Sequence, residues 1–281
     1  DREKGGKRAM KIKIRWGQVF AHVILLLLLC LMVYPLFMAV WCSFKSTAQF
    51  NLTKWYPTLP LNFENVFYAA KELDVYILNT IFVGGAGTLG MLAVSSLAAY
   101  AFARMKFYLK NALYAMVIGL MMLPAIMTLV PSFMLYKKLV GTDSYLILIL
   151  PIITGGSVFG VFLLRGFFEG LNESIFEAAK IDGAGDFVCY TKICLPLSVP
   201  ILTTLAIMQL SGAWNDYIWP MIAIPSDASK LTIAAAIKKE FLSANTGSYP
   251  TLFAGYLISS VPLILLYVFS NKSVSYTHLR A

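Results

Sequence analysis

The chain has 281 residues, of which 59% are hydrophobic and 13% are charged, and its formal net charge is +9. Such a composition excludes a soluble domain with a polar coat and favours a protein embedded in a membrane. The positive charge does not indicate nucleic-acid binding, because a basic segment ahead of an apolar run is an ordinary signal of membrane topology.

Six apolar runs are long enough to cross roughly 30 Å of hydrocarbon as helices. In chain order they cover residues 19–41, 77–103, 111–135, 145–167, 197–222 and 252–270. If the N-terminus lies inside, the inner segments carry more Lys and Arg than the outer ones, and most of the excess comes from the N-terminal tail. The positive-inside rule then predicts an all-α membrane protein with six transmembrane helices and both termini inside (N-in/C-in).

This pattern divides the chain into four parts. We predict a basic cytoplasmic tail at 1–18, a first transmembrane helix with an outer segment at 19–76, a transmembrane domain at 77–271, and an atypical end at 272–281. Ionisable residues are scarce in the middle of the runs, whereas proton- or sodium-coupled carriers usually bury several. A secondary carrier is therefore the weaker alternative for a transport protein.

Residues 169–196 form a polar, glycine-punctuated segment between the fourth and fifth runs. Ser174 and Glu177 fit a capping box, in which each side chain bonds the backbone N–H of the other residue. Alternatively, Asn172 caps the helix, which then starts two residues earlier. Gly183 fits the left-handed position just past the helix end, where a residue with a Cβ is strained.

A second short helix is predicted after this glycine, with Asp186 as its cap. In the first helix, Phe176, Ala179 and Lys180 share one side, and Ala178 lies on another. The small residues at 178 and 179 would let a partner surface approach the backbone. We therefore expect a helix–glycine–helix elbow that projects from the membrane.

The sequence lacks the motifs of several enzyme classes. No G-x-x-x-x-G-K-[ST] occurs, so the chain has no P-loop to cradle ATP, and any ATP must be bound by a partner. Nucleophile-elbow and zinc-protease motifs are also absent, which argues against an enzyme. The four cysteines fit neither a zinc ribbon nor a redox pair, and His22 and His278 lie far apart, so we expect no metal site and no cofactor.

Glu177-Ala178-Ala179 is followed by Gly183 and then by Ile-x-Leu-Pro at 193–196, which gives the spacing EAA-x3-G-x9-I-x-LP. This spacing resembles the cytoplasmic EAA loop of the membrane subunits of ATP-binding-cassette (ABC) importers. The resemblance is greatest to the maltose-permease-like subunits of carbohydrate importers. Further family-like features are the Asn79-Thr80 pair, the Ala-rich stretch 98–104, and Trp214-Asn215-Asp216-Tyr217 with Trp219-Pro220.

The resemblance implies a type I ABC importer permease fold in the bacterial inner or plasma membrane, crossed several times by the chain. It also implies the partners: a second homologous permease subunit, two cytoplasmic ATP-binding subunits and an extracytoplasmic solute-binding protein. By position, the residues that would couple this chain to the ATPase are Glu177, Ala178, Ala179, Asp182 and Gly183. No nucleic acid is expected among the partners.

The resemblance also implies a sugar or an oligosaccharide as the transported solute. Trp214, Asn215 and Trp219 are candidates for the substrate path, because aromatic rings stack on sugar faces and an amide bonds hydroxyl groups. Alternatively, both tryptophans are ordinary residues of the membrane–water boundary. Another polar solute, such as a modified oligosaccharide or a phosphoglycerol, remains the alternative substrate.

The end of the chain departs from the family. Such subunits usually continue past the sixth span with an aromatic residue and then a Gly- and Ala-rich tail. Residues 272–281 have none of this character. We interpret them as a foreign end on a truncated reading frame.

Overall fold

A computed structural model of the chain describes residues 16–241 and 248–275. The predicted tail at 1–18 and the atypical end at 272–281 therefore fall outside the described residues, except for residues 16–18 and the backbone of 272–275. No strand occurs in the part of the chain that the structure describes, so the prediction of an all-α protein is confirmed.

Six helices lie within residues 16–169, and the rest of the described chain adds shorter ones around two long helices. In order they are α1 (Trp16–Ser43), α2 (Thr47–Leu52), α3 (Glu64–Arg104), α4 (Lys110–Met121), α5 (Ala125–Val140) and α6 (Tyr145–Glu169). Then follow α7 (Glu173–Ile181), α8 (Asp186–Cys189), the π-helix η1 (Tyr190–Cys194), α9 (Leu195–Leu197) and α10 (Val199–Asn215). The last are α11 (Ile218–Ala223), the 3-10 helix η2 (Ala228–Lys230), α12 (Ile233–Ala236), the π-helix η3 (Ile237–Phe241) and α13 (Tyr249–Ser275).

Among the described residues, four helices are long and apolar enough to cross a membrane, namely α1, α3, α6 and α13. Two bent pairs also qualify if each pair is one span: α4 with α5, and the helical segment Asp186–Leu197 with α10. The number then reaches six. The six predicted runs correspond to these elements, but two of them are not continuous helices.

The predicted third span at 111–135 is broken. Helix α4 ends at Met121, α5 begins at Ala125, and their axes meet at 105°. Pro124 lies at the break with extended backbone angles, and its ring denies the chain a backbone N–H for continuing the helix. The prediction of one uninterrupted helix here was wrong.

The predicted fifth span at 197–222 is also divided, because α10 ends at Asn215 and α11 begins at Ile218. Asp216 has extended angles between them, and its Oδ1 accepts hydrogen bonds from the N–H groups of Ile218 and Trp219, at 3.1 and 3.3 Å. The carboxylate therefore satisfies the free N–H groups at the start of α11.

The helix that contains the second predicted span is longer than the apolar run at 77–103. Helix α3 begins at Glu64, ahead of the predicted residue 77, and its 41 residues extend roughly 60 Å. Its first turns are helical because Ala69 and Leu73 are buried against Ile233 and Ile237 of the later chain. Part of the segment predicted as an outer connector is therefore helix.

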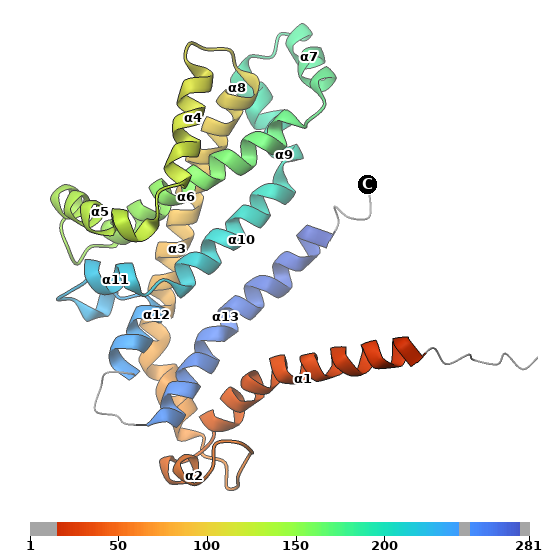
Figure 1. Ribbon diagram of the computed structural model, residues 1–281. Coiled ribbons are helices and arrows are strands. Elements are labelled where there is room, and N and C mark those ends of the chain that lie inside the picture. The colour runs from red at the N-terminus through yellow and green to blue at the C-terminus, as the bar shows by residue number, and fades with distance from the viewer. Residues whose placement is uncertain (1–15, 242–247, 276–281) are drawn as a thin grey trace, which may run out of the picture.

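Helix α3 is the axis of the bundle, and α6, α10 and α13 pack along it (Figure 1). Its contact with α6 is close: a Cβ on Gly87 would lie 2.6 Å from Cγ2 of Ile152, and one on Gly160 would lie 2.8 Å from Cβ of Ser95. Helix α1 instead leaves the bundle, and no residue of its most apolar stretch is buried in this chain.

The bundle has two ends that differ in structure. At one end, here called the α7 end, the C-terminal end of α3 lies near α4, α7 and α8 (Figure 1). At the other, here called the α12 end, the start of α3 lies near α2 and α12. The elbow predicted from the sequence lies at the α7 end.

Candidate coupling elbow and pathway cavity

The first helix of the elbow, α7, is capped by Asn172. The Asn172 Oδ1 accepts hydrogen bonds from the Ser174 backbone N–H at 3.1 Å and from the Ser174 hydroxyl at 2.9 Å. The alternative prediction, with Asn172 as the cap, is therefore confirmed. The capping box of Ser174 with Glu177 was wrong, because α7 has already begun at Glu173 and the Ser174 hydroxyl donates to the cap residue.

The helix ends as predicted at a left-handed glycine. Gly183 has a φ of +83°, and its N–H donates to the Lys180 carbonyl at 3.0 Å. The Ala184 N–H donates to the Ala179 carbonyl at 2.9 Å. These two bonds form a Schellman motif, which satisfies the last carbonyls of α7 and turns the chain sharply.

The second helix, α8, begins differently from the prediction. Gly185 occupies its cap position and Asp186 is its first residue, so the prediction of Asp186 as the side-chain cap was wrong. The Asp186 Oδ1 lies 3.5 Å from the Lys180 Nζ instead, and this exposed ion pair joins the two helices across the glycine turn. Carboxylates in the first turn of a helix are also favoured by its dipole.

The elbow separates a buried face from an exposed one. Phe176 is buried, with 5% of its surface exposed, and Ala179 is half-buried beside it. The other residues predicted to couple to the ATPase are exposed, namely Glu177, Ala178, Asp182 and Gly183. A face with small side chains and two carboxylates is thus presented outward at the α7 end.

Arg104, at the end of α3, holds the buried face of the elbow. Its Nη2 donates to the carbonyls of Phe168 and Leu171, both at 2.6 Å, and its guanidinium carbon lies 4.4 Å from the centre of the Phe176 ring. This role of Arg104 was not predicted from the sequence. A single Arg at the end of an Ala-rich helix was the available signal, but its partners lie more than sixty residues away in the chain.

A second connection joins α3 to the elbow through Tyr190 of η1. The hydroxyl oxygens of Tyr190 and Ser96 are 2.7 Å apart, and the Tyr190 ring lies 5.4 Å from that of Tyr100. Both tyrosines are buried. Packed rings and a hydrogen bond therefore join η1, which follows the elbow in the chain, to α3.

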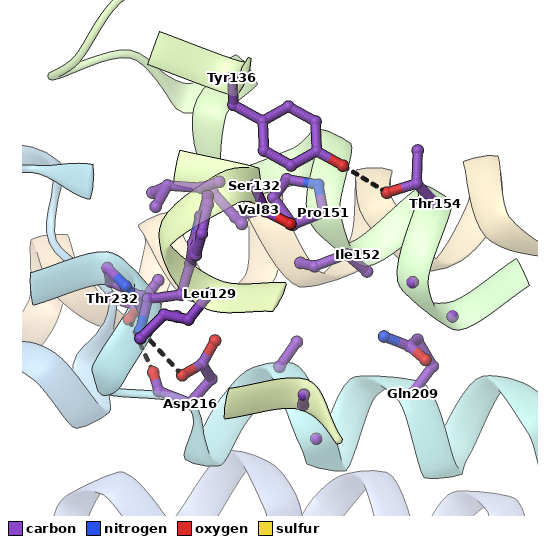
Figure 2. Close-up of a pocket in the computed structure, with 18 of the residues that line it drawn as sticks. Val83, Leu129, Ser132, Tyr136, Pro151, Ile152, Thr154, Gln209, Asp216 and Thr232 are labelled. Carbon is purple, nitrogen blue, oxygen red and sulfur yellow. Dashed lines mark hydrogen bonds between the residues drawn. The ribbon is translucent and has the colours of Figure 1, made fainter. Parts of the chain in front are cut away.

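A cavity of about 370 Å³ lies between α5, α6, α10 and α11 (Figure 2). Its wall is apolar, with Leu129, Pro151 and Ile152 among the lining residues. The polar residues that line it are Thr128, Ser132, Tyr136, Thr154, Gln209, Asp216 and Thr232. The Tyr136 hydroxyl of α5 and Thr154 Oγ1 of α6 form a hydrogen bond of 2.6 Å that joins the two helices at the cavity wall.

The structure does not bring the three candidate path residues together. Trp219 lines the cavity and is held by a hydrogen bond from its Nε1 to the Ile147 carbonyl at 2.8 Å. Trp214 donates instead to the Ser259 carbonyl of α13 at 3.1 Å, and Asn215 donates to Ser211 of its own helix. Neither Trp214 nor Asn215 lines the cavity.

Comparison with known proteins agrees with this architecture. The family model of the binding-protein-dependent transport system inner membrane component matches residues 91–276. The sn-glycerol-3-phosphate transport system permease protein of Yersinia enterocolitica is 30% identical over 264 residues, which cover 90% of this chain and 93% of the relative. The arabinooligosaccharides transport system permease protein of Halalkalibacterium halodurans is 29% identical, with coverages of 85% and 87%.

A solved structure has the same fold. It is that of a bacterial ABC transporter involved in the import of the acidic polysaccharide alginate, and its matching chain superposes with a TM-score of 0.78 at 23% identity. The match covers 94% of this chain and 99% of that one. The chain described here therefore belongs to the family of binding-protein-dependent transport system inner membrane components, as a transport protein of the membrane and not an enzyme.

Proposed function

We propose that the chain is one of two permease subunits in an ATP-driven importer of sugars or oligosaccharides, and that its elbow binds a separate ATPase. The observation that carries the coupling role is the division of the elbow into two faces. Glu177, Ala178, Asp182 and Gly183 are exposed at the α7 end, while Phe176 fixes the same helix to Arg104 of α3. A force on the exposed face would reach the bundle through that buried contact.

The proposed orientation places the α7 end in the cytoplasm. The Lys and Arg residues of the N-terminal tail favour an N-in, C-in topology. An even number of crossings before the elbow then puts α7 on the same side as the N-terminus. ATP is bound by the partner subunits in this scheme, because no P-loop sequence occurs in this chain.

The remaining partners are those that the family implies. A second homologous permease would complete the pathway, as expected for a binding-protein-dependent transport system. A solute-binding protein would dock at the α12 end and release its ligand there. The names of the relatives support a polar solute: one is a transporter of arabinooligosaccharides, and the other, of glycerol phosphate, supports the alternative substrate.

Co-purification from the native membrane tests the assembly. In mild detergent, we expect the chain to bring down a P-loop ATPase and a second permease with an EAA loop, both identified by mass spectrometry. A chain that purifies alone and moves solute into vesicles without ATP would contradict the proposal and favour a secondary carrier.

Site-directed crosslinking tests the elbow itself. The variant Ala178→Cys places a thiol on the exposed face of α7, and Ala70→Cys places a matched thiol on an exposed position of α3 at the α12 end. Both are made with Cys30→Ser, because Cys30 is exposed whereas Cys42, Cys189 and Cys194 are buried. We expect only the thiol at 178 to crosslink to the ATPase. Crosslinking at 70, or at neither position, would refute the coupling role.

A further inference from the structure

The cavity between α5, α6, α10 and α11 has the chemistry of a ligand site. We propose that it is a subsite for an uncharged, polyhydroxylated ligand, a sugar unit of the transported solute, and that Asp216 disfavours anionic ligands. This proposal rests on the proposed function and specifies its substrate class. It assigns ligand contact to this permease chain itself, in addition to whatever the second permease contributes.

Two side chains of the cavity have unused hydrogen-bonding capacity. The Gln209 amide and the Ser132 hydroxyl make no hydrogen bond with the rest of the described chain, and both are half-buried in the cavity wall (Figure 2). An amide offers two donors and an acceptor, and a hydroxyl offers a donor and an acceptor. Sugar hydroxyls also donate and accept, so they match both groups.

A glycine makes room for the amide. A Cβ on Gly156 of α6 would lie 2.7 Å from Gln209 Oε1 and 2.9 Å from Cγ of Met91. The absence of a side chain at 156 therefore allows α10 to bring Gln209 against α6 at the cavity wall. Any larger residue there would displace the amide.

Another part of the cavity wall is aromatic and fixed. Trp219 is only 9% exposed, its Nε1 is bonded to Ile147, and its ring meets that of Tyr136 edge-on, with centres 5.7 Å apart. Such a wall presents a rigid apolar surface beside the hydroxyls of Tyr136 and Thr154. A sugar, which has both apolar C–H faces and hydroxyl edges, fits this combination.

The charge of the lining favours a neutral ligand. Among the described lining residues, Asp216 is the only carboxylate and no Lys, Arg or His occurs. A phosphate or carboxylate ligand would need a cationic partner, most often Arg. It would instead meet the Asp216 carboxylate, and like charges repel. The lining therefore differs from what the anionic substrates named for two similar proteins, glycerol phosphate and alginate, require.

Tryptophan fluorescence tests the proposal. The sample is the complete complex of this chain, the second permease and the ATPases, reconstituted in lipid nanodiscs without the binding protein. The probes are arabinobiose, a neutral disaccharide, and glycerol 3-phosphate and digalacturonate, two anions. We expect arabinobiose to change the emission saturably, and this change to disappear in Trp219→Phe. Gln209→Ala should weaken arabinobiose binding about fivefold, as expected for one lost hydrogen bond. The anions should give no response at the same concentrations.

The charge selection is tested by Asp216→Asn, which keeps an oxygen acceptor for the N–H groups of Ile218 and Trp219. We expect this variant to bind digalacturonate at least about fivefold more tightly than the wild type. Asp227→Asn, a matched loss of a carboxylate outside the cavity, should leave anion binding unchanged. If Asp216→Asn fails to assemble, Ser132→Lys adds a cation to the wall and should admit glycerol 3-phosphate.

Three results would overturn the proposal: no probe binds, the arabinobiose signal survives in Trp219→Phe, or an anion binds the wild type as tightly as arabinobiose. Unchanged anion binding in both Asp216→Asn and Ser132→Lys would remove the selection by charge. Failure of the proposed function is distinguishable, because it would appear in the same preparation as absence of the ATPase or the second permease.

Discussion

At the α7 end, the long side chains of Arg104 and Tyr190 hold the elbow through ring contacts and hydrogen bonds. At the α12 end, the short side chains of Asn79 and Thr80 bond the backbone of the later chain, beside the apolar contacts of Leu73. The Asn79 Nδ2 donates to the carbonyls of Ser229 and Leu231 at 2.7 and 3.0 Å, and its Oδ1 accepts from the Tyr145 hydroxyl at 2.8 Å. The Ile233 N–H donates to Thr80 Oγ1 at 2.8 Å. Long side chains can change rotamer to follow a displaced partner, but short side chains bonded directly to a backbone fix a single register.

The difference suggests a division of labour along α3. The α7 end presents an exposed surface that long side chains hold on the bundle, which suits a joint between moving subunits. The α12 end holds three distant segments in one arrangement, which suits a rigid element that is moved as a unit. Substitutions at the two ends should therefore have different effects. Those at the α7 end should reduce coupling, and those at the α12 end should reduce stability.

The largest effect is expected from Gly183→Val at the α7 end. The φ of +83° places this residue in the left-handed region, which costs a residue with a Cβ about 1–2 kcal/mol and a β-branched one more. We expect the subunit to insert and assemble, while substrate-stimulated ATP hydrolysis and uptake in vesicles fall about tenfold.

The matched control is Gly185→Ala. Gly185 has an ordinary φ of −75°, and a Cβ there would meet no atom within 4 Å. It should retain full activity. Full substrate-stimulated hydrolysis in Gly183→Val would show that the left-handed turn is not needed for coupling.

A smaller loss of coupling is expected from Arg104→Lys. Lysine keeps the charge, but it lacks the planar group that bonds the Phe168 and Leu171 carbonyls while it stacks on Phe176. We expect uptake to fall about fivefold, consistent with the loss of roughly 1 kcal/mol of cation–π and hydrogen-bond energy. The ATPase should still co-purify with the variant.

Arg165→Lys provides the comparison. Its guanidinium carbon lies 3.7 Å from the centre of the Tyr114 ring, and its Nη2 pairs with Glu169 at 2.8 Å, so it joins α6 to α4 without contacting the elbow. This variant should reduce uptake less than twofold, because Arg165 does not contact the elbow. Equal losses in the two variants would mean that Arg104 only stabilises the bundle.

At the α12 end, Asn79→Leu should reduce stability and not coupling. Leucine has a similar volume but leaves the Ser229 and Leu231 carbonyls and the Tyr145 hydroxyl without their partner. We expect a loss of about 1–3 kcal/mol, seen as a Tm lowered by several degrees in detergent. The ratio of uptake to ATP hydrolysis in the surviving complexes should remain unchanged. A changed ratio with an unchanged Tm would reverse the roles assigned to the two ends.

Local signals explain what the sequence predicted correctly. The apolar runs located the long helices, because a membrane helix needs a continuous apolar stretch whatever its neighbours are. The turn at Gly183 and the cap at Asn172 are likewise determined within a few residues.

Features that depend on tertiary contacts could not be predicted from the sequence. Pro124 breaks the third run, whereas Pro131 and Pro151 lie inside helices, and nothing in the flanking residues separates these cases. Likewise, the early start of α3 depends on residues of α12 and η3 that bury Leu73, and the contact of Arg104 with Phe176 depends on the fold of the elbow.

The smallest effect concerns the pH dependence of the corner that links α5 and α6 to the later chain. The N–H groups of Asp227 and Ser226 donate to the Asp143 carboxylate at 2.8 and 2.9 Å and hold its pKa below the usual value for aspartate. The ion pair of Lys230 with Asp227, at 2.9 Å, adjoins the same corner. A carboxyl whose pKa is lowered by folding contributes stability above its unfolded pKa, and loses this contribution as the pH falls through the folded value.

Asp143→Asn separates this titration from the geometry. Asparagine keeps the acceptor oxygen and tolerates the φ of +57° at this position, but it does not ionise between pH 6 and pH 3. We expect the Tm of the wild type to fall further than that of the variant over this interval, by no more than about 2 °C because the corner is exposed. A steeper fall in the variant would mean that the carboxylate charge destabilises this corner.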